Sequence, residues 1–294
     1  KTLDMSVYTM AQIVALTGVK AHTLRKWETR YNFLEPERTD TNIRYYSDKQ
    51  LKKLMNIGIL TRNGYRISKI DKMSDEEIHK HIATTLIESS EEDDISALII
   101  SALEMDEVTF DSILKEQIVK RGLLQTTTQI IYPFLNQIGV LWGINKVMPA
   151  QEHFVSNLIK KKMFAAIDAL PYPKEDAPVI MMFLTENEHH EIGLLLAYYM
   201  ARDLGWKVYY LGQNVPTENI QQVIDIVKPN AMLSMFITPT QESVKTKLDA
   251  ILEQTNVPYW VSGNPAVIED VMEDDRIGFI SKPDDLILKL KQID

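Results

Sequence analysis

Cysteine is absent from this sequence of 294 residues. The chain can therefore form no disulfide, thiolate zinc site or iron–sulfur cluster and has no cysteine nucleophile, so any metal must be bound by histidine or carboxylate. The hydrophobic content of 45% and the charged content of 25% are ordinary for a soluble globular protein. At this length we expect two or three domains.

Long apolar runs are also missing. The longest mostly apolar run, Ile192 to Met200, is far shorter than the roughly 18 residues of a membrane-spanning helix. The N-terminal residues lack the basic, apolar and small-residue order of a secretory signal peptide. We therefore expect a cytoplasmic protein with no membrane partner.

Positive charge is scarce overall but concentrated at one end. The net charge is −9, yet residues 1–73 hold 14 Lys and Arg against 7 Asp and Glu, whereas the remaining residues hold 18 against 34. A basic head on an acidic body is expected where only the head meets a polyanion such as DNA. A basic surface can also be no more than a solvated face.

The basic head has the pattern of short helices joined by tight turns. Apolar residues recur at helical spacing on both sides of Gly18, which predicts a helix, a glycine turn and a second helix within 8–31. The second helix carries cations on its outer faces and could lie in a DNA major groove. The polar segment 32–50 predicts a β-hairpin wing, and a further helix is predicted at 49–62, with Asp48 as its cap.

Four segments of the head, "YTMAQIVALTGV", "TLRKWETRY", "LEPERTDTNIRYYSDKQLKKL" and "GYRISKI", follow one another within residues 7–73. In order and spacing they resemble the DNA-binding domain of MerR-type transcription regulators. The resemblance implies a winged helix-turn-helix that binds double-stranded operator DNA as a dimer, on a pseudo-palindrome. For any single contact residue, a solvated cation or a packed tyrosine is the alternative. The residues placed near DNA are Thr23, Arg25, Lys26 and Arg30 on the second helix, and Arg44 and Tyr45 on the wing.

Residues 75–170 contain almost no strand signal. Apolar residues recur there every three or four positions, and acidic residues or a proline stand at the starts of the repeats. We expect a small four-helix bundle, closed by a proline-rich linker, "PYPKEDAP". The four predicted helices are 93–105, 106–122, 125–143 and 149–170.

After the linker, short apolar runs alternate with helical stretches. This alternation predicts a parallel doubly wound sheet, whose ligands bind beyond the carboxyl ends of the strands. The segment "TENEHHEIG", 185–193, is the loop that leaves the first strand, before a helix predicted from His190. The predicted strands are 179–184, 206–211, 231–236, 259–263 and 277–280.

The loop 185–193 has several chemical interpretations. A zincin needs a second histidine four positions after His190, and Leu194 stands there, so that interpretation fails. Two carboxylates acting as acid and base stay open, although nothing in the sequence gives them different roles. The helix dipole also favours acidic residues at a helix N-terminus, by ~0.3–1 kcal/mol each. It accounts for Glu188 but not for a histidine three positions before Gly193.

The order Glu188-x-His190-x-x-Gly193 resembles the D/E-x-H-x-x-G signature of cobalamin-binding domains. The resemblance implies that His190 is the axial ligand of cobalt and that Glu188 holds the other imidazole nitrogen and fixes its tautomer. Gly193 would let the displaced tail of the corrin pass close to the backbone. A surface histidine is the alternative.

A second motif lies in the helical stretch. Trp142, nine intervening residues and Glu152-His153 resemble the W-x(9)-E-H motif of cobalamin-dependent, light-sensing MerR regulators of the CarH/LitR type. The resemblance implies that these three residues cover the group on the upper face of cobalt. A core tryptophan and a capped helix start are the alternative. Photosensing members can have a histidine directly after the tryptophan, and Gly143 stands there in this chain.

The rest of the cobalamin signature is matched in part. In the family, a Ser-x-Leu turn after the third strand and a Gly-Gly after the fourth line the slot for the nucleotide tail, and this chain has Ser-Met-Phe and Gly-Asn. The resemblance assigns Ser234 and Gly263 to the cofactor site. Phe236 can instead fill the slot, and Asn264 can block the close approach of the tail.

These interpretations predict an all-α winged helix-turn-helix head at 1–74, a helical bundle of the cobalamin-cap type at 75–172, and an α/β doubly wound, Rossmann-like domain at 173–294. They imply a non-enzymatic transcriptional repressor that senses adenosylcobalamin, and through it light, by cofactor-dependent assembly into a homo-oligomer, a dimer or tetramer. One alternative is the same scaffold regulating independently of cobalamin, through another ligand or a partner. A corrinoid carrier subunit of a methyltransferase is the other, but such a carrier has no use for a winged helix.

Overall fold

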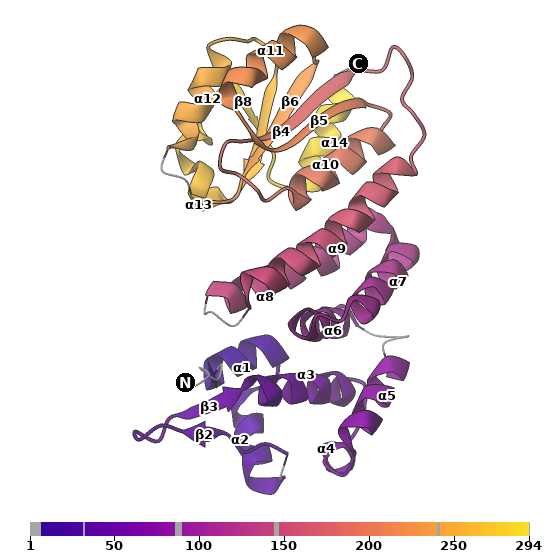
Figure 1. Ribbon diagram of the computed structural model, residues 1–294, viewed down its shortest axis with the longest axis vertical. Helices are drawn as coiled ribbons and strands as arrows, with labels where there is room; N and C mark the ends of the chain where they lie inside the picture. Colours follow the sequence, from indigo (N-terminus) through magenta and orange to yellow (C-terminus); the bar gives the residue numbers. More distant parts are fainter. Residues whose placement is uncertain (1–6, 32, 86–89, 144–146, 240–241, 294) are drawn as a thin grey trace. The chain divides into compact units, whose positions relative to one another are not determined.

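The computed structural model describes residues 7–31, 33–85, 90–143, 147–239 and 242–293, without the side chains of 83–85, 140, 142 and 143. The chain forms two compact units, divided after Leu158. In the part of the chain that is described, no helix is long and apolar enough to cross a membrane. Figure 1 shows the elements in chain order.

The head of the first unit has the predicted helix, turn, helix and wing. Strand β3 pairs antiparallel with β2 to form the wing, and it also pairs with β1. The head therefore contains a three-stranded sheet that an all-α description leaves out. Its elements are β1 (Val7–Thr9), α1 (Met10–Thr17), α2 (Ala21–Arg30), β2 (Glu37–Arg38), β3 (Arg44–Ser47), α3 (Asp48–Arg62), α4 (Ile67–Ile70) and α5 (Asp75–Thr85).

Local capping sets the ends of the head helices. Thr9 starts α1 and Ser47 starts α3, each in a capping box with the glutamine three residues on. Gly18, in the left-handed region at φ 69, ends α1 and begins the turn into α2. The predicted cap Asp48 is instead the first helical residue of α3, and its carboxylate accepts a hydrogen bond of 2.6 Å from the Tyr8 hydroxyl.

Four longer helices follow where the apolar spacing predicts them. Helix α6 contacts both α7 and α8, and Phe110 and Phe134 meet edge to face in their core, with ring centroids 5.4 Å apart. Gly122 interrupts α7 at φ 79, a conformation that glycine adopts without strain. These elements are α6 (Glu91–Glu104), α7 (Glu107–Thr126), a π-helical turn (Thr127–Ile131), α8 (Tyr132–Gly143) and α9 (Pro149–Asp168).

The second unit contains the predicted parallel sheet, with strand order β5-β4-β6-β7-β8. The chain leaves β4 for β5 on one side and later continues with β6 on the other side. The carboxyl ends of β4 and β6 therefore flank a topological switch point, where ligands of such sheets bind. The strands are β4 (Val179–Thr185), β5 (Lys207–Val215), β6 (Ala231–Phe236), β7 (Tyr259–Gly263) and β8 (Ile277–Phe279).

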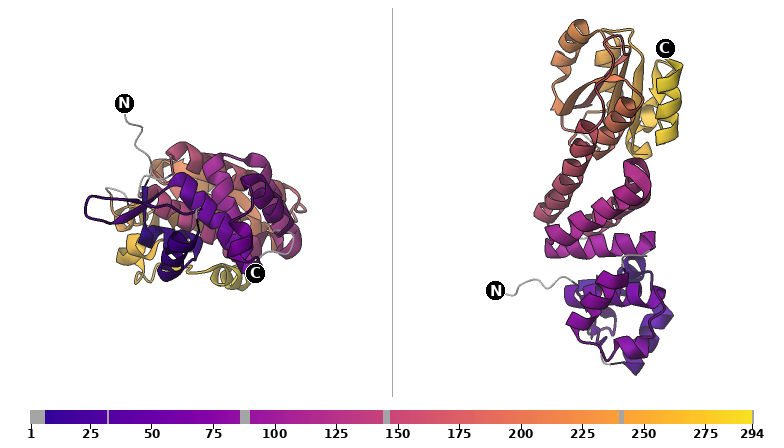
Figure 2. Two further views of the ribbon diagram at one scale, coloured as in Figure 1. Left: turned by 90° about the horizontal axis from the view of Figure 1, so that it is seen from below. Right: turned by 90° about the vertical axis from the view of Figure 1, so that its right-hand side faces the viewer.

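Helices cover both faces of this sheet. Figure 2 shows α14, in yellow, on one side of the sheet and the orange helices on the other. Helix α10 begins at Ile192, not at the predicted His190, so the histidine lies in the loop before the helix. Helices α10 (Ile192–Asp203) and α14 (Pro283–Gln292) contact each other, as do α11 (Thr217–Val227) and α12 (Val244–Leu252), and the short α13 (Pro265–Ile268) and a 3-10 turn (Glu269–Val271) follow β7.

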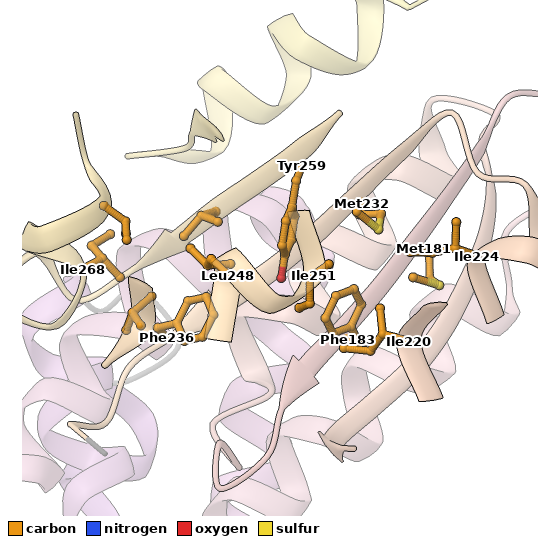
Figure 3. Packing of buried hydrophobic residues seen from close by; sticks show 13 residues of the cluster. Met181, Phe183, Ile220, Ile224, Met232, Phe236, Leu248, Ile251, Tyr259 and Ile268 are labelled. Atoms are coloured by element: carbon orange, nitrogen blue, oxygen red, sulfur yellow. The ribbon is translucent and has the colours of Figure 1, made fainter. Parts of the chain in front are cut away.

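An apolar core fills the space between the sheet and the helices α11 and α12 (Figure 3). Phe183 of β4, Phe236 of β6 and Tyr259 of β7 are all buried in it, among aliphatic side chains of the two helices. Burial of a large apolar side chain contributes about 1.5–3 kcal/mol. The core therefore fixes the strand ends from which the loops of the site project.

Candidate ligand site and nucleic-acid interface

One buried carboxylate organises the loop between β4 and α10. Oε1 of Glu188 accepts hydrogen bonds from the backbone N–H groups of His189 (2.9 Å) and His190 (3.0 Å) and from Nδ1 of His190 (2.8 Å). Oε2 accepts from the backbone N–H groups of Ile237 (2.7 Å) and Thr238 (2.9 Å), which follow β6. The carboxylate thus joins the loop after β4 to the loop after β6, across the switch point.

These donors keep Glu188 ionised. Burial alone raises the pKa of a carboxyl group, but the hydrogen bonds from the His190 side chain and from backbone N–H groups outweigh it, and the pKa of Glu188 falls from 4.5 to about 2. A carboxylate only accepts hydrogen bonds, so the pattern assigns a proton to Nδ1 of His190. The neutral tautomer then has its lone pair on Nε2, the atom through which it could bind a metal.

The His190 side chain is 57% exposed, although the carboxylate behind it is buried. The Thr238 hydroxyl also lies 2.9 Å from its Nδ1. An imidazole oriented by a carboxylate on one nitrogen has the arrangement of a metal-ligating histidine. Among the described residues, no group of three or more His, Asp and Glu side chains could hold a metal ion. A metal at His190 therefore has to bring its other ligands with it.

The loop is fixed in place by residues that sequence reasoning missed. Asn187 adopts a left-handed φ of 66, and its N–H donates to Oδ1 of Asn214 at 3.0 Å. The N–H of Asn214 donates in turn to the Glu188 carbonyl at 3.2 Å. Nζ of the buried Lys247 donates to the carbonyl of Glu186 at 2.8 Å. No spacing rule finds these partners, because they come from β5 and α12, far along the chain.

Glu191, next to the histidine, has different partners. It is buried at the start of α10, where Nζ of Lys160 lies 3.2 Å from Oε1 and the Tyr210 hydroxyl donates to Oε2 at 2.8 Å. Burial and this hydrogen bond raise the pKa of Tyr210 well above its usual value. Glu188 and Glu191 share no partner in these hydrogen bonds. The remaining residue of the predicted signature, Gly193, lies in the first turn of α10.

The strand ends beside the loop are tightly packed. Ser234 is fully buried in β6, and its hydroxyl lies close to the buried hydroxyl of Tyr259 in β7. A Cβ atom on Gly263 would lie 2.0 Å from the carbonyl oxygen of Phe236, so only glycine fits there. Phe236 is 3% exposed and belongs to the core, and Asn264 caps α13 through a 3.1 Å hydrogen bond from the Ala266 N–H.

The second cobalamin motif is described only in part. Trp142 belongs to α8, but its side chain lies outside the described residues. Glu152 stands in the first turn of α9, where it accepts a 2.5 Å hydrogen bond from the Ser156 hydroxyl and lies 3.2 Å from Nδ1 of His153. The His153 side chain is 74% exposed. The role of these three residues stays a prediction.

Helix α2 presents the predicted cations to solvent. Leu24 and Trp27 are buried against the rest of the head. Thr23 is half-buried on the same helix, and the cations on the other faces are exposed: Arg25, Lys26 and Arg30. A helix that binds in a major groove has this arrangement, with one face buried against the domain and cations exposed on the other faces.

The wing is fastened to α2 through Glu28. Its carboxylate accepts from Nε of Arg44 at 2.6 Å and from Arg38 at 2.5 Å. Burial acts against the charge of Glu28, but the two guanidinium groups lower its pKa. Tyr45 donates to Glu37 within the wing at 2.8 Å. Arg38, which sequence reasoning missed, thus occupies the wing beside the two predicted residues.

A basic depression lies at α4, in the same head. Its cations recur every three residues, a spacing that a helical turn brings to one side. Nζ of Lys69 also lies 5.8 Å from the ring centre of Tyr65. The depression extends the positive surface of the head beyond the predicted residues. It is lined by Asn63, Gly64, Tyr65, Arg66, Ser68, Lys69 and Lys72.

Comparison with known families matches the winged head and the helical domain. Residues 8–77 match the family described as MerR HTH family regulatory protein, and residues 95–166 match the family described as B12 binding domain. The chain carries a MerR-type helix-turn-helix and a B12-binding domain. The first match covers the winged head, and the second covers most of α6 to α9.

Two relatives from Myxococcus xanthus align with this chain over most of their length. The HTH-type transcriptional repressor CarH is 27% identical over 261 residues, which are 85% of this chain and 87% of the relative. The HTH-type transcriptional repressor CarA is 26% identical over 234 residues, 76% of this chain and 75% of the relative. The chain is homologous to both, and it is a transcriptional regulator with a MerR-type helix-turn-helix and a B12-binding domain.

A solved structure shares the fold of the ligand-binding part. The monomethylamine corrinoid protein of Methanosarcina barkeri aligns with 65% of this chain and 94% of its own, with a TM-score of 0.52 and 17% identity. At that identity the likeness concerns the fold alone. The fold is therefore one that a solved corrinoid protein shares.

Proposed function

We propose that this chain is a repressor that binds operator DNA through its winged head and senses adenosylcobalamin, and through it light. The observation that carries the proposal is the pair formed by Glu188 and His190. An ionised, buried carboxylate holds one nitrogen of an exposed imidazole at the switch point of a sheet, and this is how a metal-ligating histidine is oriented.

The residues present fit a corrinoid. His190 would bind the cobalt of such a cofactor, and the cofactor would bring the other ligands, which the described side chains do not supply. Ser234 places a buried hydroxyl on the same sheet, beside that of Tyr259. Adenosylcobalamin, when bound, supplies a cobalt–carbon bond that light can break. We assign Trp142, Glu152 and His153 to the upper face, as their motif implies.

Regulation would follow from assembly. If cofactor binding holds several chains together, their DNA heads bind one operator jointly, and avidity can exceed the affinity of a single head by ~10²–10⁴. In this proposal the chain has no catalytic role. Loss of the assembly in light would release the DNA, so the state of His190 and its cofactor controls repression.

The test is a visible absorption spectrum of the full chain mixed with adenosylcobalamin in the dark and again after green light, followed through gel filtration. We expect a bound spectrum with histidine in place of the cofactor's own base, and a change in elution volume on illumination. A colourless protein whose elution ignores cofactor and light would overturn the proposal.

A second candidate keeps the scaffold without the cofactor. It is favoured by Phe236, which is committed to the apolar core, and by Asn264, which is committed to capping α13. Such a regulator would respond to another ligand or partner. Adenosylcobalamin binding by the wild type and by Phe236→Leu discriminates the two candidates. If the wild type does not bind the cofactor and the variant does, the wild type is a cobalamin-independent regulator.

A further inference from the structure

One arginine connects the helix-turn-helix to the first helix of the B12-binding domain. Nε of Arg62, at the end of α3, donates to Oδ1 of Asp93 in α6 at 2.6 Å. Its Nη1 donates to the carbonyl of Thr17 at 3.3 Å, and its Nη2 to the hydroxyl of Ser96 at 3.4 Å. A single guanidinium therefore contacts both α1 and α6, which belong to the same unit.

The contact between Arg62 and α1 lies at the turn of the helix-turn-helix. Thr17 is the last residue of α1, and its carbonyl is among those that a helix end leaves without an intrahelical partner. Gly18, which follows, begins the turn into α2. The chain leaves room for this contact at Gly58, where a Cβ would lie 3.3 Å from both the Arg62 Nη1 and the Thr17 carbonyl oxygen.

The contact on the side of α6 is buried. The Asp93 side chain is 1% exposed, and its second oxygen accepts a 2.7 Å hydrogen bond from Nδ2 of Asn63. A buried carboxylate with this set of partners cannot lose one of them without leaving an uncompensated charge. Movement of the first turn of α6 must therefore carry Arg62 with it or break the pair.

We propose that Arg62 is a positioning residue that transmits the state of the B12-binding domain to the helix-turn-helix turn, through Asp93. This rests on the proposed function, because it names the path by which that function reaches DNA. A shift of α6 changes the donor geometry at the Thr17 carbonyl, and the turn that sets the angle of α2 follows. The pair thus makes DNA affinity depend on the helical domain even within a single chain.

The test is hydrogen exchange of the full chain carrying Asp93→Asn. The amides of Gly18, Thr23 and Leu24 are bonded within the turn, to carbonyls of Val14 and Lys20. We expect their exchange to quicken at least ten-fold, with the circular dichroism of the chain unchanged. Arg62→Lys, which keeps the charge but loses the forked donors, is the second variant and should act in the same direction.

The matched control is Glu91→Gln. Glu91 lies in the same first turn of α6 and pairs with Arg121 at 2.6 Å, so the variant also loses an ion pair there without touching the turn. Its exchange at the turn should stay within two-fold of wild type. If Asp93→Asn affects only α6, or if Glu91→Gln affects the turn equally, the assignment of Arg62 is wrong.

A second measurement separates this inference from the proposed function. The affinity for a duplex selected by the wild-type chain from a random pool is measured with and without adenosylcobalamin in the dark. The ratio of the two affinities should fall at least five-fold toward unity in Arg62→Lys. An unchanged ratio contradicts the inference. A wild type whose DNA affinity does not change with the cofactor contradicts the proposed function, and the role of Arg62 is then judged from the hydrogen exchange alone.

Discussion

Nδ1 of His190 lies 2.8 Å from Oε1 of Glu188, and the two side chains differ sharply in exposure, at 57% for the imidazole and 2% for the carboxylate. The carboxylate is held from the other side by backbone N–H groups after β6. The imidazole is thus oriented by a rigid partner while its ring faces outward. Three of the predictions concern this pair itself.

Replacing His190 by alanine should remove axial ligation. We expect the affinity for adenosylcobalamin to fall and the spectrum of any remaining complex to lose the signature of histidine ligation, measured by titration followed by visible absorption. The adjacent His189 is exposed and its ring has no role in the proposal, so His189→Ala is the control. Equal losses in both variants would argue against His190 as the ligand.

Replacing Glu188 by glutamine should weaken cofactor binding without removing the ligand. Loss of such an outer partner typically costs about 10–100-fold in metal affinity. All hydrogen-bond partners of the Glu188 carboxylate are donors, so the N–H₂ group of glutamine would face other N–H groups. The variant should therefore be less stable as well. Titration with adenosylcobalamin and a urea melt measure the two effects, and unchanged affinity in a folded variant would contradict the role of Glu188.

The stability of the second unit should depend on pH through Glu188. Its pKa is depressed from 4.5 to about 2 in the folded state. The corresponding stabilisation, about 3 kcal/mol, is present above pH 4.5 and is lost as the pH falls from there toward 2. Urea unfolding at several pH values measures it. The gap in unfolding free energy between wild type and Glu188→Gln should narrow over that interval, and a gap independent of pH would contradict the prediction.

Binding of duplex DNA should weaken with salt, and less steeply when head cations are removed. Each phosphate contact contributes a slope of roughly 0.9 in the logarithmic salt dependence. Arg25→Ala and Lys26→Ala should each reduce the slope by about one such contact. Lys120→Ala, an exposed cation of α7, is the control and should leave the slope unchanged. Fluorescence anisotropy between low and moderate salt measures all three.

Gly263→Ala should destabilise the second unit because the new methyl group has no space. Its Cβ would meet the Phe236 carbonyl oxygen at 2.0 Å, so β6 and β7 must separate. We expect a cost of about 2–3 kcal/mol or more. Gly205→Ala has φ +87 but open space around it, so it should cost only about 1 kcal/mol. Similar urea midpoints for both variants would contradict the steric argument.

Much of the architecture could be predicted from residue order alone. Helical spacing around Gly18 predicted the helix, turn and helix of the head, and alternating apolar runs predicted the five parallel strands. Both patterns are local, because the period of a helix or strand is repeated within a few residues. The capping residue of α3 was wrong by one position, since Ser47 and Asp48 are both good caps and only the chain geometry selects between them.

The candidate site was predicted only as far as its own loop. The spacing of Glu188 and His190 pointed to a carboxylate behind a histidine, and the structure brings their side chains together. The partners from β5 and from the loop after β6, Asn214 and Thr238, could not be read from spacing, because they reach the loop only after the sheet has formed.

The sequence by itself determined which segments form helices and strands and which side chains carry the charge of the head. Only the tertiary structure decided that Phe236 lies in the core, that Asn264 caps a helix and that Arg62 contacts both Thr17 and Asp93. The physical reason is that secondary structure follows from periodicity and capping along the chain, whereas the partners of a buried polar group are set by packing between elements distant in sequence.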